Sequence, residues 1–120
     1  MNEIFKKTLL YDFYGELLTD NQKMIYGYYH LDDLSLGEIS EQMNISRQGV
    51  FDTLKRCEHQ LKHFEDKLHL VQKFVDNNTR VQEIYDIASG IQSQTSIEDV
   101  LIQQALIKIE GLSKNILEDL

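Results

Sequence analysis

Residues 35–56 read SLGEISEQMNISRQGVFDTLKR, and they contain the clearest structural signals of the chain. Ser35 and Glu38 have the spacing of a capping box, in which a hydroxyl and a carboxylate bind the free N–H groups at the start of a helix. Asn44 follows, and asparagine is the residue besides glycine that most readily adopts the left-handed backbone of a tight turn. Ser46 can then cap another helix. The stretch therefore predicts two helices joined by a tight turn, a helix-turn-helix.

The apolar residues of this stretch have the spacing that brings the two helices together. Ile39 and Met43 of the first helix and Val50 and Leu54 of the second can meet in one small core. Ile45 would close the corner of the turn. This packing leaves the first turns of the second helix exposed, and in such motifs they enter the major groove of DNA.

Two more helices are predicted before the motif. The first should run from Glu3 to Leu18, because apolar residues form a broad face along it. Thr19 and Gln22 have the spacing of another capping box, so the next helix should begin there. The polar run from His30 to Leu34 should end it.

After the motif, apolar residues recur in alternating steps of four and three from Val50 to Val75. A helix from Ser46 to Val75 would be roughly 45 Å long, which exceeds the width of a helix-turn-helix core. Its Leu61–Val75 part must therefore pack on something else. The stripe is either the seam of a homodimer or a seam covered by the first and last helices of the same chain. A dimer through this part and the C-terminal helices is expected.

The C-terminal segment is predicted to be helical with polar interruptions. The run from Asp76 to Thr79 should stop the long helix, Thr79 with Gln82 should cap the next one, and Thr95 with Glu98 should cap another. The chain then divides into a helix-turn-helix domain with a long recognition helix, residues 1–75, and a C-terminal helical segment, residues 76–120. That segment would pack on the long helix or on a second subunit.

The composition favours an all-α protein of the cytosol. The 120 residues include no proline and six glycines, and few segments alternate as strands do. No apolar run reaches the roughly 18 residues that cross a bilayer, and the first residues lack the pattern of a secretory signal. Cys57 lies on the apolar stripe, so core packing is expected of it in place of redox chemistry.

The formal net charge of −8 opposes the approach of nucleic acid. The excess acid lies mostly downstream, because residues 1–64 have a net charge of −3 and residues 65–120 of −5. Between Arg47 and Lys62, four basic side chains accompany only Asp52 and Glu58. This helix is mildly positive, so any affinity for DNA should be modest and lost at moderate salt.

Side chains that avoid the Val50 and Leu54 face form the candidate reading surface. Arg47 could bind guanine and Gln48 adenine through two hydrogen bonds each, while basic side chains further along would bind phosphates. Phe51 and Asp52 suit a thymine methyl and a cytosine amine less well, and they would serve equally in a protein interface. The candidate nucleic-acid-binding residues are Ser35, Ser46, Arg47, Gln48, Phe51, Asp52, Lys55 and Arg56.

No catalytic site, metal site or cofactor is predicted. The chain has no phosphate-binding glycine loop and no nucleophile with a nearby base. His59 and His63 have the spacing of a metal pair on a helix, but no third ligand accompanies them. An enzyme is therefore not expected.

Specific short motifs point to two known families. Leu18-Thr19, Tyr28-Tyr29 and the run Ser35-Leu36-Gly37-Glu38-Ile39 resemble region four of bacterial sigma factors over residues 18–60. A closer resemblance, strongest over residues 10–75, is to the YlxM family. It rests on the motifs YDFY at residues 11–14, LLT at 17–19, SRQGVFD at 46–52 and LKR at 54–56.

Members of the YlxM family are small helix-turn-helix proteins, mostly of Gram-positive bacteria, encoded beside the Ffh subunit of the signal recognition particle. The resemblance implies the same fold here and a link to that particle's pathway. Two functions stay open. The protein is either a DNA-binding regulator, or an accessory factor of the particle that binds no DNA. Such a factor would bind a protein such as Ffh, or RNA. A salt titration separates them, because phosphate contacts give a steep negative slope.

Overall fold

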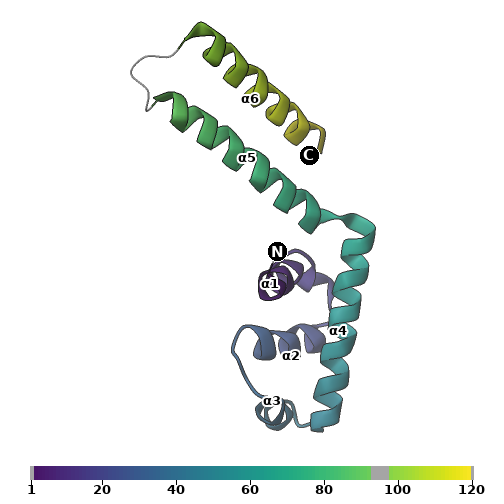
Figure 1. Ribbon diagram of the computed structural model, residues 1–120. Helices are drawn as coiled ribbons and strands as arrows, with labels where there is room; N and C mark the ends of the chain where they lie inside the picture. Colours follow the sequence, from purple (N-terminus) through teal and green to yellow (C-terminus); the bar gives the residue numbers. More distant parts are fainter. Residues whose placement is uncertain (1, 93–97, 120) are drawn as a thin grey trace. The chain divides into compact units, whose positions relative to one another are not determined.

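The computed structural model describes residues 2–92 and 98–119 (Figure 1). Within these residues every regular element is a helix, as the all-α prediction requires. The chain forms two units, Met1–Val71 and Gln72–Leu120. In order, the elements are α1 (Glu3–Tyr14), the 3-10 turn η1 (Gly15–Leu17), α2 (Asp20–His30), α3 (Leu36–Met43), α4 (Arg47–Leu68), α5 (Leu70–Gln92) and α6 (Asp99–Asp119).

The first unit is built on α4, against which α1, α2 and α3 pack (Figure 1). Its centre is made of side chains with no exposed surface, Ile25 from α2, Ile39 from α3 and Val50 from α4. Cys57 is equally buried, as the sequence predicts. Burying large apolar side chains stabilises such a core by roughly 1.5–3 kcal/mol each.

The local signals around the motif are confirmed. Two of the four predicted capping boxes are closed, the one at Thr19 with Gln22 and the one at Ser35 with Glu38. The one predicted at Thr79 with Gln82 does not form, because both residues lie inside α5. Asn44 ends α3 in the left-handed conformation with φ 55°. Ser46 Oγ accepts a hydrogen bond of 2.9 Å from the backbone N–H of Gly49. The helix-turn-helix therefore follows from hydrogen bonds made within a few residues; the predicted cap at Thr95 lies outside the described residues.

The prediction of one helix from Ser46 to Val75 is wrong, because the chain breaks at His69. This residue ends α4 in the left-handed conformation with φ 57°. Tyr14 Oη, from α1, donates a 2.5 Å hydrogen bond to Glu65 Oε1 and accepts one of 3.1 Å from the backbone N–H of Leu70. Glu65 Oε1 also accepts a hydrogen bond of 2.9 Å from the backbone N–H of Val71. These bonds satisfy N–H groups that a continuous helix would have used itself.

The burial that accompanies this network raises the pKa of the Tyr14 hydroxyl to about 12, and the hydrogen bond to Glu65 adds to the effect. Tyr14 is 1% exposed. A neutral hydroxyl is therefore held at the junction of α4 and α5, where it acts as donor and acceptor at once.

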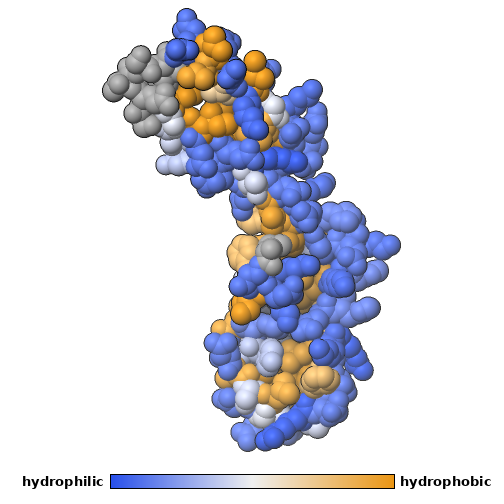
Figure 2. Space-filling model, in the orientation of Figure 1, coloured by the Kyte–Doolittle hydropathy of each residue, from blue (hydrophilic) through white to orange (hydrophobic). Residues whose placement is uncertain are grey.

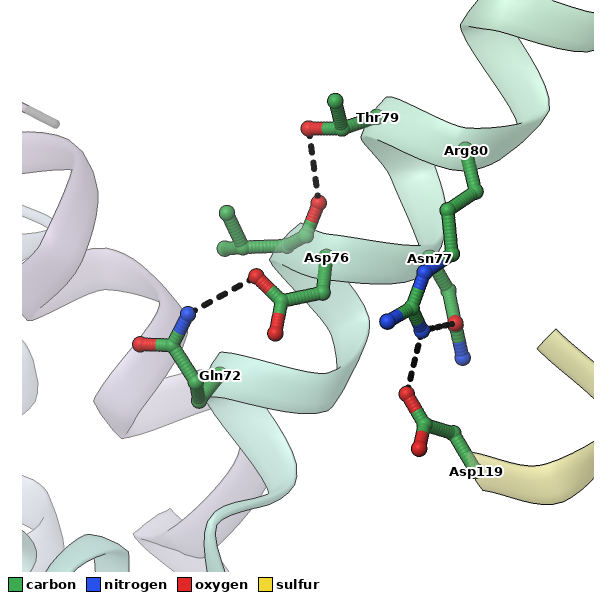
Figure 3. Close-up of polar contacts among 7 residues, drawn as sticks. Gln72, Asp76, Asn77, Thr79, Arg80 and Asp119 are labelled. Atoms are coloured by element: carbon green, nitrogen blue, oxygen red, sulfur yellow. Dashed lines mark hydrogen bonds and ion pairs between the residues drawn. The ribbon is translucent and has the colours of Figure 1, made fainter. Parts of the chain in front are cut away.

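The predicted stop between Asp76 and Thr79 is also wrong, since α5 runs through it without interruption (Figure 3). Gln72 Nε2 donates to Asp76 Oδ1 at 2.8 Å, and Thr79 Oγ1 donates to the carbonyl of Val75 at 3.2 Å. Arg80 donates to Asn77 Oδ1 at 2.9 Å. Gln72 and Arg80 thus bind side chains about one turn away, and the Thr79 hydroxyl shares the Val75 carbonyl with the helix, a contact that a helix tolerates without breaking.

The first half of the apolar stripe from Val50 to Val75 is covered by helices of the same chain. Leu54, Cys57 and Leu61 lie in the core of the first unit, and Phe64 packs on Tyr14 with ring centroids 6.0 Å apart. The expectation that the apolar stripe from Leu61 onward forms a dimer seam therefore does not hold for Leu61, which has no exposed surface.

The second unit is a pair of helices, α5 and α6, that run in opposite directions (Figure 1). Along α5 the half-buried residues include Ile84, Ile87 and Ile91, and along α6 they include Ile102 and Ile109. The steps of three, four and seven are those of a helix seam. No helix in the described part of the chain is long and apolar enough to cross a membrane.

Candidate nucleic-acid interface

The start of α4 presents the predicted reading surface to solvent. Arg47, Gln48, Asp52, Lys55 and Arg56 are all exposed, and they surround the buried Val50–Leu54 face of the helix. Because α3 and the turn at Asn44 hold this end of α4, the exposed side chains project from a rigid element. Positions on a fixed helix are held more precisely than positions on a loop.

Arg47 is positioned by a neighbour on α3. Its guanidinium lies over Gly37, so closely that a methyl group at Gly37 would come within 3.1 Å of Arg47 Nη2. Within the described chain Arg47 makes no ion pair or hydrogen bond through its side chain. The guanidinium is therefore directed by packing alone, and its donors are available to a ligand.

Gln48 and Asp52 are paired with each other. Gln48 Nε2 donates to Asp52 Oδ1 at 2.9 Å, one helical turn along α4. The bond occupies one amide donor and partly satisfies the carboxylate. Asp52 thus repels phosphate less than a carboxylate without this hydrogen bond would. Gln48 can bind a base edge only if its bond to Asp52 opens.

Phe51, Lys55 and Glu58 form a second row along α4. The Phe51 side chain is 44% exposed, and Lys55 Nζ lies 5.5 Å from the centre of its ring. Glu58 lies between two ammonium groups, 3.7 Å from Lys7 Nζ and 3.8 Å from Lys55 Nζ. This row is apolar at one end and nearly neutral at the other, so its attraction for phosphate is weak.

Arg56 and the two cap serines complete the predicted set. Arg56 is exposed and has no ion pair in the described part of the chain, so it adds positive charge beyond the first two turns. Ser35 and Ser46 accept backbone hydrogen bonds of 3.1 Å and 2.9 Å. Their hydroxyl protons are still available to a phosphate, and both serines lie at the start of a helix, where backbone partial charge attracts anions.

Sequence reasoning missed the part played by two glycines. Besides Gly37, Gly49 has close neighbours, because a methyl group there would lie 3.2 Å from Ser46 Oγ. A glycine within a helix costs about 1 kcal/mol relative to alanine, so each occurrence inside a predicted helix is a signal of close approach. Gly37 and Gly49, in the first turn of α3 and of α4, carried that signal.

Three titratable groups with shifted pKa values lie behind the interface, Tyr26 and Cys57 in the core and the half-buried His30. Burial raises the pKa of the Cys57 thiol to about 11, with a smaller contribution from Glu58. Burial likewise raises the pKa of Tyr26. Burial, and then the charge of Lys7, lower the pKa of His30, whose ring lies 4.1 Å from that of Tyr26. These groups stay neutral near pH 7.

Metal ligands do not gather anywhere in residues 2–92 and 98–119, where no three His, Cys, Asp or Glu side chains could hold an ion. His59 and His63 lie on the exposed side of α4.

The chain is similar to known proteins along most of its length. The model of the UPF0122 family, helix-turn-helix proteins described as YlxM / p13 like, matches residues 1–101. A UPF0122 protein of Desulforamulus reducens is 43% identical over 118 residues, which cover 98% of this chain and 96% of the relative. One from Thermoanaerobacter sp. is 57% identical over 108 residues, 88% of this chain and 92% of the relative. The UPF0122 protein YlxM of Bacillus subtilis is 41% identical over 101 residues, which cover 84% of this chain and 90% of the relative.

Proposed function

Since the chain belongs to the YlxM / p13-like family of helix-turn-helix proteins, we propose that it is a DNA-binding regulatory protein that reads a duplex with the first turns of α4. The observation that carries the proposal is the Arg47 guanidinium, which lies over Gly37 at the exposed start of α4 without an ion pair among the described residues. A guanidinium held there matches the two acceptors of a guanine in the major groove.

The other residues divide by their place on the helix. Gln48 would bind adenine once its bond to Asp52 opens, and Lys55 and Arg56 would bind phosphates. Ser35 and Ser46 would add hydroxyl contacts to phosphates beside the helix starts. Phe51 would contact a thymine methyl. Few net positive charges contribute, so the complex should be weak and sensitive to salt.

The test is binding to fluorescent duplexes of about 30 base pairs, roughly three helical turns, first as a random pool and then as selected sequences. Arg47→Ala should cost about 1–3 kcal/mol on selected sequences and relax the choice of sequence. Lys55→Ala should weaken all duplexes alike and reduce the salt slope by about one. Tight binding that survives high salt would contradict phosphate attraction as the main force.

Gly37→Ala is the sharpest variant, because it touches no nucleic acid itself. Alanine favours the helix, but its methyl group would lie 3.1 Å from Arg47 Nη2, so the guanidinium must shift by a few tenths of an ångström. The variant should therefore be at least as stable as the parent and bind selected duplexes more weakly. Gly111→Ala, where a methyl group would have nothing within 4 Å, is the matched control and should leave binding unchanged.

A second candidate function is an accessory role in the signal recognition particle, without DNA. The exposed Phe51 beside Asp52 favours it, because an aromatic and an acidic side chain suit a protein surface better than a phosphate backbone. A pull-down from lysate, with and without nuclease, would be scored for DNA, Ffh and the particle RNA. If Phe51→Ala abolishes capture of Ffh while Arg47→Ala leaves DNA retention unchanged, this second function replaces the first.

The remaining parts of the proposal concern location, chemistry and assembly, and the last of them rests on the DNA-binding role. The protein acts in the cytosol, where DNA and the particle are found, and binds without catalysis. It acts as a homodimer, since helix-turn-helix proteins commonly read two half-sites with two copies.

A further inference from the structure

A small cavity lies between α1, α2 and α4 of the first unit, beyond the candidate reading surface. Its volume is about 310 Å³, close to the lower limit for cavities that bind small molecules. The floor is formed by Leu10, Tyr26 and Leu61, all of them buried. Figure 2 shows hydrophilic side chains along most of the outer side of α4. The cavity therefore has an apolar floor within a polar surface.

Two lysines at this cavity have no acidic partner. Lys6 from α1 and Lys62 from α4 both line it, and both are exposed. Neither of them makes an ion pair within residues 2–92 and 98–119. Each ammonium group is therefore available to an anion, which lysine binds as a point charge.

The carboxylates at the cavity are outnumbered. Glu58 lies 3.7 Å from Lys7 Nζ and 3.8 Å from Lys55 Nζ, so two ammonium groups share its charge. Glu3 is exposed one turn before Lys6 and Lys7 on α1. Three lysines and two glutamates line the cavity, which leaves one net positive charge in a chain whose formal net charge is −8. The cavity thus has the sign of charge that favours an anion.

The Tyr26 hydroxyl is an unused hydrogen-bond donor at the same cavity. Tyr26 is 1% exposed, and its hydroxyl makes no hydrogen bond within the described residues. His30 Nε2 is the one buried side-chain polar atom without a partner in that part of the chain, so the Tyr26 oxygen still touches solvent, and Tyr26 lines this cavity. Because burial raises the pKa of the hydroxyl, it keeps its proton. An acceptor bound in the cavity would satisfy this donor.

We propose that the cavity binds a small organic anion, a phosphate monoester or a carboxylate with a body about as large as one ring. Lys6 and Lys62 attract the anionic group, and the Tyr26 hydroxyl donates to one of its oxygens. The apolar body lies on Leu10 and on the alkyl chains of the lysines, which cover apolar surface while their ammonium groups stay in water. A bare inorganic anion would leave most of the cavity to water, so it binds more weakly.

Titration of the full chain with four probes, followed by proton–nitrogen correlation NMR without nucleic acid, tests the site. Phenyl phosphate or benzoate should bind with a dissociation constant of about 1 mM or below and shift the backbone signals around the cavity. The tighter of these two anions identifies the anionic group. Benzyl alcohol has the ring without the charge, and inorganic phosphate has the charge without the ring. Each of them should bind at least about tenfold more weakly.

Substitutions then assign the binding to the cavity. Lys62→Gln should raise the dissociation constant of the tighter anion about tenfold, because it removes a charged donor. Tyr26→Phe should raise it about fivefold at unchanged stability, since the hydroxyl has no bond within the described chain to lose. Lys67→Gln is the matched control: Lys67 is another exposed lysine of α4 without an ion pair in the described residues, about 140° around the helix from Lys62. It should change the constant less than about twofold.

Three results would overturn the proposal. They are the absence of binding by both organic anions, binding of benzyl alcohol or inorganic phosphate as tight as that of the organic anions, and equal weakening by Lys62→Gln and Lys67→Gln. Circular dichroism of each variant shows that its helices are intact. Because the titration contains no DNA and leaves Arg47 unchanged, its outcome does not depend on the proposed reading of a duplex.

Discussion

The two units of this chain have similar charge and helix content, yet only one of them has a core. All twelve buried apolar side chains found in the described residues lie between Leu9 and Val71. In the α5–α6 hairpin, half-buried residues form a seam and the other apolar residues stay exposed. In the first unit α1, α2 and α3 all pack against α4 and together enclose a centre (Figure 1), whereas two helices side by side can share only a line of contact. The first unit should thus be stable by itself, and the hairpin only with a partner.

The same substitution placed in each unit gives the strongest contrast. Val50→Asp puts an unpaired carboxylate where α3 and α4 meet, at a position with no exposed surface. It should cost about 3–5 kcal/mol and unfold the first unit at ordinary temperatures. Val100→Asp, on a residue 63% exposed in the first turn of α6, should shift stability by less than about 0.5 kcal/mol. Thermal melts of both variants would refute this register of α4 if Val50→Asp melted like the parent.

A second contrast tests the network that ends α4. Tyr14→Phe removes the hydroxyl that Glu65 and the N–H of Leu70 share, and should destabilise the protein by about 1–3 kcal/mol. Tyr85→Phe changes a side chain that is 66% exposed and should have almost no effect. Urea denaturation measures both. Equal stabilities would mean that the hydroxyl contributes nothing to the break at His69.

Two glycine substitutions should raise stability alike but differ in their effect on DNA binding. Gly111→Ala in α6 should stabilise the protein by roughly 0.5–1 kcal/mol, because nothing lies within 4 Å of the new methyl group. Gly37→Ala gains the same helix propensity but displaces Arg47. Melting temperatures should rise in both variants, while only Gly37→Ala loses affinity for DNA. If Gly111→Ala also lost affinity for DNA, that affinity would not depend on the position of Arg47.

The smallest expected effect is a pH dependence confined to the first unit. Burial keeps the pKa of His30 below its usual 6.5, so the unfolded chain takes up this proton first as the pH falls. Its contribution to stability is therefore complete above about pH 6.5 and is lost toward the lower folded pKa. His30→Gln should reduce the loss of stability between about pH 7.5 and pH 5. The hairpin contains no histidine, so a parallel loss in its helicity would point to another group.

The helix-turn-helix could be read from sequence because its determinants are local. The caps at Thr19, Ser35 and Ser46 act over three residues, and the left-handed turn at Asn44 is a property of one residue. The exposure of the reading surface followed from helical periodicity around Val50 and Leu54. The position of Arg47 over Gly37 did not, since it depends on how closely two helices approach.

What the tertiary structure decided is where the long helix ends. An unbroken apolar stripe from Val50 to Val75 and a polar run at Asp76–Thr79 both argued for a helix that stops after Val75. The break instead lies at His69, where Tyr14, more than fifty residues away in sequence, binds the backbone of the next helix. Side chains at the polar run bind within α5, so that helix continues. Local hydrogen bonds can be read from residue order, but a helix that could continue or bend takes the course for which distant side chains supply the missing bonds.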